Sequence, residues 1–268
     1  MSTTEVYALF SANAYEGPWK SKLKHGIPDS WKRLPIDPLL LDDNVTGLRA
    51  HVYHNYGLKE LVIAYAGTHR GDKGDLEAIG EILSGRLPKQ FQSAFTVYSK
   101  VKDYLDEKDV RAQISFTGHS LGGALAQYMA IVAKGCSAET FGAPGILGAL
   151  EALRNDYIPG YPYPVVNHVA RGDLIGYYGH HLGKVDYHIF DATDILPIAL
   201  PLYIRTQVVL SLASGSYFSH SIERYVTGLR HFHGISCVPT GYVSYRDGKT
   251  KQVVNIVNWA GVARKEYI

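Results

Sequence analysis

The sequence has few cysteines and almost no excess of charge. Cys136 and Cys237 are the only cysteines among 268 residues, which is too few to indicate a disulfide framework or a zinc site. Cys136 lies in an apolar stretch and is interpreted as a buried thiol. The formal net charge of +2 provides no electrostatic surface for nucleic acid, so no nucleic-acid partner is expected.

The sequence also lacks a typical export signal and a typical membrane span. Residues 1–5 carry no positive charge and no long apolar run follows them, so we expect a cytoplasmic protein or one exported without a cleaved signal. The longest apolar stretch, 195–212, contains Pro197, Pro201 and Arg205, which argues against a transmembrane helix. It is interpreted as a cap or core segment, with a lipid-facing surface as the alternative.

The apolar pattern predicts one α/β domain. A hydrophobic fraction of 46% suffices for one core, and no repeat or linker divides residues 1–268. Residues 1–45 are expected to wrap around this domain, and residues 234–268 to pack on it as a C-terminal extension. Alternating strands and helices favour a mainly parallel central sheet flanked by helices. The expected strands are 48–53, 61–65, 113–117, 138–141, 165–170 and 185–190, and the expected helices are 91–105, 121–134 and 220–229.

The most informative motif is Gly-His-Ser-Leu-Gly at residues 118–122. It follows a predicted strand and opens a predicted helix, which is the context of a nucleophile elbow. A serine on so tight a turn is strained and its neighbours pass close by, so Gly118 and Gly122 must be small. The helix N-terminus can face developing negative charge. Ser120 is therefore the candidate nucleophile, and a serine in a glycine-rich helix cap is the alternative.

A serine nucleophile needs a base, and the base needs an acid that orients it. In one common order, the acid and then the histidine follow the serine along the chain. Asp173 lies just beyond the predicted strand 165–170, at the end where catalytic groups of open α/β sheets gather. It is the candidate acid, with a solvated turn aspartate as the alternative. The competing carboxylates are Asp186, Asp191 and Asp194.

His220 is the candidate base because it lies where a loop meets the predicted helix 220–229 and can approach a neighbouring strand end. His231 and His233 are the runners-up. Three other histidines follow Asp173 so closely that little chain remains for a return to the serine, and they are interpreted as structural or surface histidines: His180, His181 and His188.

An oxyanion hole requires two N–H donors. Leu121, directly after the candidate nucleophile, should supply one. The second should come from the loop after an earlier strand, and Thr68 follows the predicted strand 61–65 at the appropriate place. An ordinary turn at the strand end is the alternative for Thr68.

In this order, these segments resemble the class 3 lipases, a fungal-type family of the α/β-hydrolase superfamily. The resemblance runs from about residue 60 to about residue 228 and excludes the first 45 residues and the tail after Gly234. Alanine stands at position 66 where the family commonly has arginine, and Leu174 stands where proline is common. The segments that carry the resemblance are Ala66-Gly67-Thr68, residues 118–123, Thr140-Phe141-Gly142-Ala143-Pro144, residues 166–173, His181-Leu182-Gly183 and the helix from His220 to Tyr225.

The resemblance also implies a helical lid after the oxyanion loop. Residues 75–83 form a short amphipathic pattern, which as a lid could open at a lipid surface and make transient contact with a membrane. A surface helix that covers the core is the alternative. The apolar side of this segment consists of Leu76, Ile79, Ile82 and Leu83.

For function, the resemblance implies a serine hydrolase of lipid degradation that needs no metal and no cofactor. It would be a phospholipase A1 or triacylglycerol lipase that cleaves carboxylic esters through an acyl-enzyme. The missing leader, small size and basic pI slightly favour the phospholipase. One alternative is an esterase or acyltransferase for soluble esters. The other is an inactive lipid-binding pseudo-hydrolase, which the filled triad disfavours. The sequence leaves protein partners unassigned.

Overall fold

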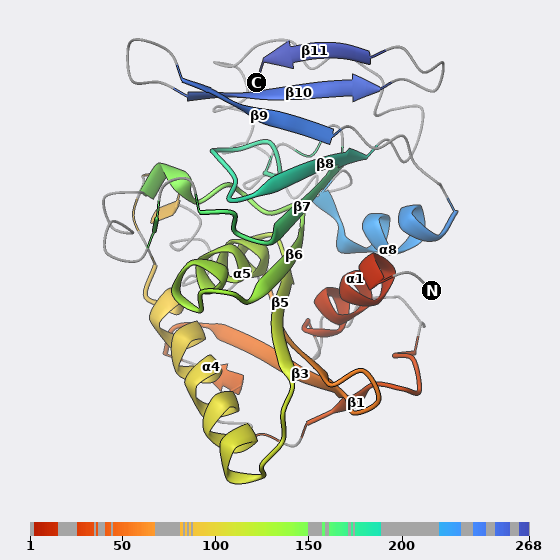
Figure 1. Cartoon of the computed structure of the whole chain (residues 1–268), viewed down its shortest axis with the longest axis vertical. Helices are drawn as coiled ribbons and strands as arrows, with labels where there is room; N and C mark the ends of the chain where they lie inside the picture. The colour runs from red at the N-terminus through yellow and green to blue at the C-terminus, as the bar shows by residue number, and fades with distance from the viewer. Residues whose placement is uncertain are drawn as a thin grey trace.

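A computed structural model describes most of the chain (Figure 1). The described residues are 3–15, 26–34, 36, 41–43, 45–67, 81–82, 84, 86, 88–149, 157–158, 161–170, 173, 175–188 and 220–231, together with the strand backbones at 238–244, 250–257 and 263–267.

A central sheet of eight strands organises the molecule, in the order β1-β3-β4-β5-β6-β7-β8 with β2 paired to β3. Strands β4 to β8 run parallel, whereas β1, β2 and β3 form antiparallel pairs. The carboxyl ends of the parallel strands therefore meet at one edge. The strands are β1 Lys32–Arg33, β2 Asp42–Asp43, β3 Leu48–Asn55, β4 Glu60–Tyr65, β5 Gln113–His119, β6 Ser137–Phe141, β7 Val165–Ala170 and β8 Lys184–His188.

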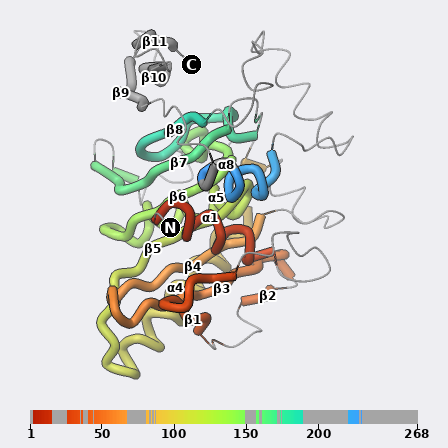
Figure 2. Tube along the Cα trace, turned by 90° about the vertical axis from the view of Figure 1, so that its right-hand side faces the viewer, coloured from red at the N-terminus to blue at the C-terminus, as the bar shows by residue number. Residues whose placement is uncertain are grey.

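Helices cover both faces of this sheet (Figures 1 and 2). We call the face covered by α4 and α5 the α5 side, and the face covered by α1 and α8 the α1 side. A short 3-10 helix, Leu147–Ala149, follows β6. The helices are α1 Thr3–Asn13, α4 Gln90–Glu107, α5 Leu121–Val132 and α8 Ile222–His231.

The core is divided between the two sides. In β4, Leu61 and Ile63 belong to the apolar cluster of the α5 side, while Val62 and Ala64 belong to the cluster of the α1 side. A strand of a parallel sheet is buried on both faces, so its sequence is a continuous apolar run rather than an alternating one. This is why 61–65 could be recognised as a strand from composition alone.

The predicted α/β fold with its mainly parallel sheet is confirmed, and each predicted strand overlaps an observed one. Helix α1 was not predicted. Its residues are buried from Val6 to Ala12, so its apolar residues lie on several sides and give no amphipathic period. Also unpredicted is an antiparallel sheet of β9 Val238–Ser244, β10 Thr250–Val257 and β11 Ala263–Tyr267. The single-domain organisation of residues 1–268 stays a prediction.

In the part of the chain that the structure describes, no helix is both long and apolar enough to cross a membrane. The apolar stretch 195–212 lies outside the described residues.

Candidate active site

Ser120 sits on a strained turn between the end of β5 and the start of α5, with φ 58° and ψ −127°. A non-glycine residue at positive φ raises the energy of the backbone and persists only where its surroundings fix it. The Ser120 N–H donates to the carbonyl of Phe141 at 3.0 Å. A Cβ at Gly118 would collide with the backbone of Gly122, and one at Gly122 would collide with the Tyr65 carbonyl. The turn therefore requires both glycines.

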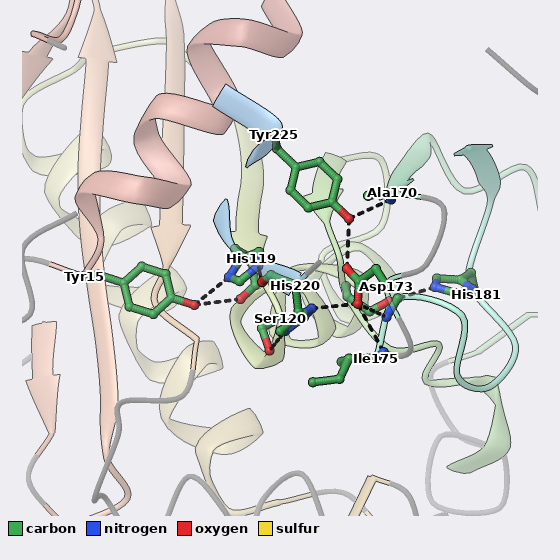
Figure 3. A network of polar contacts seen from close by, with 11 residues as sticks. Tyr15, His119, Ser120, Ala170, Asp173, Ile175, His181, His220 and Tyr225 are labelled. Atoms are coloured by element: carbon green, nitrogen blue, oxygen red, sulfur yellow. Dashed lines mark hydrogen bonds and ion pairs between the residues drawn. The ribbon is translucent and has the colours of Figure 1, made fainter. Parts of the chain in front are cut away.

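The structure brings Ser120, His220 and Asp173 together in one chain of hydrogen bonds (Figure 3). The Ser120 hydroxyl lies 2.8 Å from Nε2 of His220, and Nδ1 of His220 lies 2.8 Å from Oδ1 of Asp173. All three side chains are buried. Because a carboxylate only accepts, the proton of neutral His220 belongs on Nδ1, which leaves Nε2 to accept from the serine hydroxyl.

Asp173 is fixed in place by backbone and side-chain donors. Its Oδ1 accepts from the N–H groups of Ile175 at 3.1 Å and Gly176 at 3.0 Å. Its Oδ2 accepts from the Tyr225 hydroxyl at 2.9 Å, and that hydroxyl accepts from the Ala170 N–H at 2.8 Å. Burial, and then the neighbouring Asp173, raise the pKa of Tyr225 well above 10. The hydroxyl thus stays protonated and keeps donating to the carboxylate.

The competing carboxylate and histidines have other partners. Asp186, on β8, pairs with Lys184 at 2.8 Å. His181 contacts the Ala143 carbonyl at 2.8 Å, and His188 contacts His168 at 2.9 Å. Asp191, Asp194, His233 and the side chain of His231 lie outside the described residues.

Of the two expected oxyanion donors, the structure describes Leu121, whereas for Thr68 it describes only the preceding residue, Gly67. Leu121 is the first residue of α5, so its N–H has no partner in the helical i→i−4 ladder. At the end of β4, a Cβ on Gly67 would lie 2.5 Å from the His119 carbonyl oxygen and 3.1 Å from Cβ of Ser120. The end of β4 therefore contacts the elbow. Thr68 follows Gly67 directly in sequence but lies outside the described residues.

The predicted lid segment is described only at Glu81 and Ile82. Ile82 is buried in the same apolar cluster as Leu121. Leu76, Ile79 and Leu83 lie outside the described residues, so the lid stays a prediction.

Sequence reasoning did not assign roles to three polar residues around this centre, namely Tyr15, His119 and Tyr225. Tyr225 had a signal, since it ends the segment that resembles the family's terminal helix. His119 lies inside the elbow motif, but the motif assigns no role to this position. Tyr15 follows α1, which itself was not predicted.

The geometry defines an α/β protein with a serine, a histidine and a carboxylate hydrogen-bonded where parallel strands end. Residues 6–155 match the model of the Tle-like phospholipase domain, a phospholipase-like family. The match spans more than half of the chain, and the chain belongs to this family. The matched region contains Ser120 and ends before Asp173 and His220. It begins at residue 6, so it also includes N-terminal residues that the resemblance to class 3 lipases does not cover.

A relative of this chain also bears the name of a lipase. ATG15 of Eremothecium gossypii, named as a lipase, is 27% identical over 222 residues, which cover 65% of this chain and 38% of ATG15. The chain thus spans well under half the length of this relative.

Two solved lipases are also similar. Lip2 of Yarrowia lipolytica has a TM-score of 0.47 and 19% identity over 70% of this chain and 78% of Lip2. A lipase of Rhizopus microsporus var. chinensis has a TM-score of 0.48 and 17% identity over 69% of this chain and 72% of that lipase. The family match and the ATG15 relative confirm the predicted resemblance to lipases.

Proposed function

We propose that this protein hydrolyses a carboxylic ester of a lipid, with Ser120 as nucleophile, His220 as general base and Asp173 as the acid that orients it. The observation that carries the proposal is the pair of 2.8 Å contacts that joins the three side chains in this order. Each comes from a different segment: Ser120 follows β5, Asp173 follows β7 and His220 precedes α8. A merely structural serine needs no such arrangement.

The acylation step follows from these contacts. Oγ of Ser120 attacks the ester carbonyl carbon while its proton passes to Nε2 of His220. Asp173 stabilises the imidazolium that forms, and His220 then protonates the leaving alcohol as the carbon–oxygen bond of the ester breaks. The acyl group remains on Ser120. Negative charge on the carbonyl oxygen would be held by the N–H groups of Leu121 and Thr68.

Deacylation repeats the sequence with water as the nucleophile. His220 takes a proton from water, whose oxygen attacks the acyl carbon, and then returns the proton to Oγ of Ser120 as the fatty acid leaves. No step requires a metal or a cofactor.

The family match favours glycerophospholipid as the substrate, because the matching family is described as phospholipase-like. We therefore propose a phospholipase A1, which attacks the ester at the first acyl position of the glycerophospholipid. The experiment distinguishes this function from three alternatives. They are hydrolysis of a triacylglycerol, hydrolysis or acyl transfer of a soluble ester, and lipid binding without turnover.

The experiment compares the full chain with its Ser120→Ala variant on vesicles that contain both phospholipid and triacylglycerol. We expect fatty acid and lysophospholipid from the wild type, and a rate at least about 10⁴-fold lower from the variant, because the acyl-enzyme can no longer form. A fluorophosphonate probe should label the wild type and not the variant.

The other products would change the conclusion in different ways. Fatty acid with diacylglycerol alone would contradict the phospholipid assignment and indicate a neutral-lipid lipase. Labelling without lipid products would direct attention to soluble esters. Absence of labelling and turnover, or equal turnover by wild type and variant, would contradict the serine mechanism.

Transient membrane contact through residues 75–83 is a further part of this proposal. Ile79→Asp places a charge on the apolar side of the predicted helix, so we expect slower hydrolysis of vesicles with unchanged hydrolysis of a soluble short-chain ester. Equal loss on both substrates would contradict a lid and favour a helix that only covers the core. Ile79 is preferred to Ile82 for this test because Ile82 is buried in the core.

A further inference from the structure

A row of polar contacts joins one face of β5 to α1 and to the two residues after α1. The row ends beside the candidate nucleophile. The side chains on the helical segment are four residues apart, and their partners on the strand are two residues apart. We call this row the α1–β5 seam. Its three contacts are Tyr7 to Ser115 at 2.6 Å, Ser11 to Thr117 at 2.9 Å, and the Tyr15 hydroxyl to Nδ1 of His119 at 2.8 Å.

The two spacings match in length. Four residues of α-helix advance by about 6 Å, and two residues of β-strand advance by about 6.6 Å. The helical turn continues past α1, since the Ala14 N–H donates to the Phe10 carbonyl at 3.0 Å. The seam therefore fixes how far α1 lies along β5, and this places Tyr15 beside the elbow.

The last contact of the seam continues into the site (Figure 3). Nε2 of His119 lies 2.8 Å from the backbone carbonyl oxygen of His220. The two imidazole rings are 4.7 Å apart between centroids. A Cβ on Gly67 would collide with the Tyr15 hydroxyl, so this hydroxyl also packs against the end of β4. Tyr15 and His119 thus link α1, β4 and β5 to the backbone of the candidate base.

The donors and acceptors of this chain are set by chemistry. A carbonyl oxygen can only accept, so Nε2 of His119 carries the proton and donates to His220. Burial, and then the nearby His220, hold the pKa of His119 well below 6.5, so His119 has a single proton. Its Nδ1 is then an acceptor and receives the Tyr15 hydroxyl proton. A neutral His119 also adds no positive charge beside His220 when that ring must accept a proton.

We propose that Tyr15 and His119 are positioning residues for the base of this enzyme: Tyr15 selects the Nε2–H tautomer of His119, and that N–H holds the His220 carbonyl so that the His220 ring spans Ser120 and Asp173. This inference rests on the proposed function. It assigns to the N-terminal segment a part in catalysis without contact with substrate.

The test measures kcat and KM on a soluble short-chain ester with the full chain. Tyr15→Phe removes one hydroxyl and leaves the ring. His119→Leu removes the donor to the carbonyl, whereas His119→Gln keeps an amide N–H near the position of Nε2. The fourth variant combines Tyr15→Phe with His119→Gln.

We expect Tyr15→Phe to lower kcat about 10-fold, the effect of one hydrogen bond that aligns the base. His119→Leu should lower kcat up to about 100-fold through misplacement of the base. KM should stay within about twofold in each case, because the proposal gives neither residue a contact with substrate. His119→Gln should recover most of the loss. In the His119→Gln background, Tyr15→Phe should have almost no further effect, because an amide has no tautomer to select.

Tyr7→Phe is the matched control. It removes a buried tyrosine hydroxyl from the same seam, at the contact farthest from Ser120. We expect a lower unfolding midpoint and unchanged kcat. If His119→Leu does not fold, the milder Tyr15→Phe and His119→Gln variants still decide the question.

Two results would overturn the inference while leaving the proposed function intact. One is wild-type kcat in both Tyr15→Phe and His119→Leu. The other is an equal loss from Tyr15→Phe in the wild-type and the His119→Gln backgrounds, which would indicate packing alone. Equal activity of wild type and Ser120→Ala would instead contradict the proposed function and the inference together.

Discussion

The two faces of β5 are built from different chemistry, although they belong to one strand of seven residues. Ile114 and Phe116 point to the α5 side and belong to its apolar cluster. Ser115, Thr117 and His119 alternate with them and are hydrogen-bonded to the α1 segment. The apolar face ends at Gly118 and the polar face at His119, so both converge on the elbow.

The difference matters because apolar burial and hydrogen bonding constrain a helix in different ways. Burial is proportional to area and has little direction, so a helix can shift along an apolar surface with a modest change in energy. Hydrogen bonds weaken steeply once distance or angle departs from the optimum. We infer that the α5 side mainly stabilises the fold, whereas the α1 side mainly sets positions at the site.

The largest expected effect is on activity and comes from the polar side. Asp173→Asn replaces the carboxylate that would stabilise charged His220, and we expect kcat/KM to fall about 10⁴-fold. The matched control is Asp186→Asn, which alters the competing carboxylate at β8 and should leave kcat/KM within about twofold. Steady-state kinetics on a soluble ester checks both. Similar losses in the two variants would contradict the assignment of Asp173.

The next effect is on stability and comes from the apolar side. Phe116 is fully buried and its ring packs against Tyr98 at 5.7 Å between centroids. Phe116→Ala should lower the free energy of unfolding by about 4 kcal/mol, through lost burial and the cavity left behind. Urea denaturation measures this loss. The activity of the molecules that remain folded, counted by fluorophosphonate titration, should change less than in Asp173→Asn. A larger loss of activity than of stability would break the division between the two faces.

The sequence predicted the parallel strands well and proposed three site residues that lie together in the structure, both for physical reasons. Strands buried on both faces produce apolar runs such as 61–65, and the elbow combines a glycine motif with a strand and a helix. Asp173 and His220 were chosen because chain order and strand ends restrict the candidates. The three side chains do meet in the structure, with 2.8 Å between His220 and each partner.

Helix α1 and its link to the site could not be predicted in the same way. The helix is buried on several sides, so periodicity gives no signal, and its partners on β5 are more than 100 residues away in sequence. Matching polar stripes, with a spacing of four on a helix and two on a strand, become visible only once the two segments are known to be neighbours. Tertiary contact, rather than local propensity, determines this part of the site.

A smaller effect concerns a buried imidazole outside the seam. His181 precedes Leu182, which packs in the α5-side cluster. Burial is the main cause that lowers its pKa to about 4, whereas an unfolded histidine has a pKa of about 6.5. The unfolded state therefore binds more protons between these values, and stability is lost as pH falls through this range. By pH 5 the loss relative to pH 7 should be about 2 kcal/mol.

His181→Gln isolates this contribution, because the amide can still donate to the Ala143 carbonyl but does not titrate. From pH 7 to pH 5, we expect the wild type to lose about 2 kcal/mol more unfolding free energy than the variant. Urea denaturation at both values measures it. A difference that does not depend on pH would show that His181 titrates normally in the folded protein.

The smallest effect is a coupling energy of about 1 kcal/mol, which tests the seam itself at the contact farthest from the site. Burial raises the pKa of Tyr7 to about 12, so its hydroxyl remains a donor. It can donate to Ser115, whose own hydroxyl lies 3.4 Å from the Leu61 carbonyl oxygen. Ser115→Ala leaves the Tyr7 hydroxyl buried without its acceptor and should lower the unfolding free energy by about 2 kcal/mol. Tyr7→Phe should cost about 1 kcal/mol, because Ser115 can still donate to Leu61.

The double variant should then lose less than the sum of the two, by about 1 kcal/mol, since removal of both hydroxyls leaves neither one buried without a partner. Urea denaturation of the four proteins gives this coupling energy. Additive losses would mean that the two hydroxyls do not depend on one another, and α1 would then be held on β5 by apolar packing, as on the opposite face. A clear coupling with unchanged kcat would instead separate the two functions within the seam: its first contact fixes the register of α1, and only its last contact bears on the base.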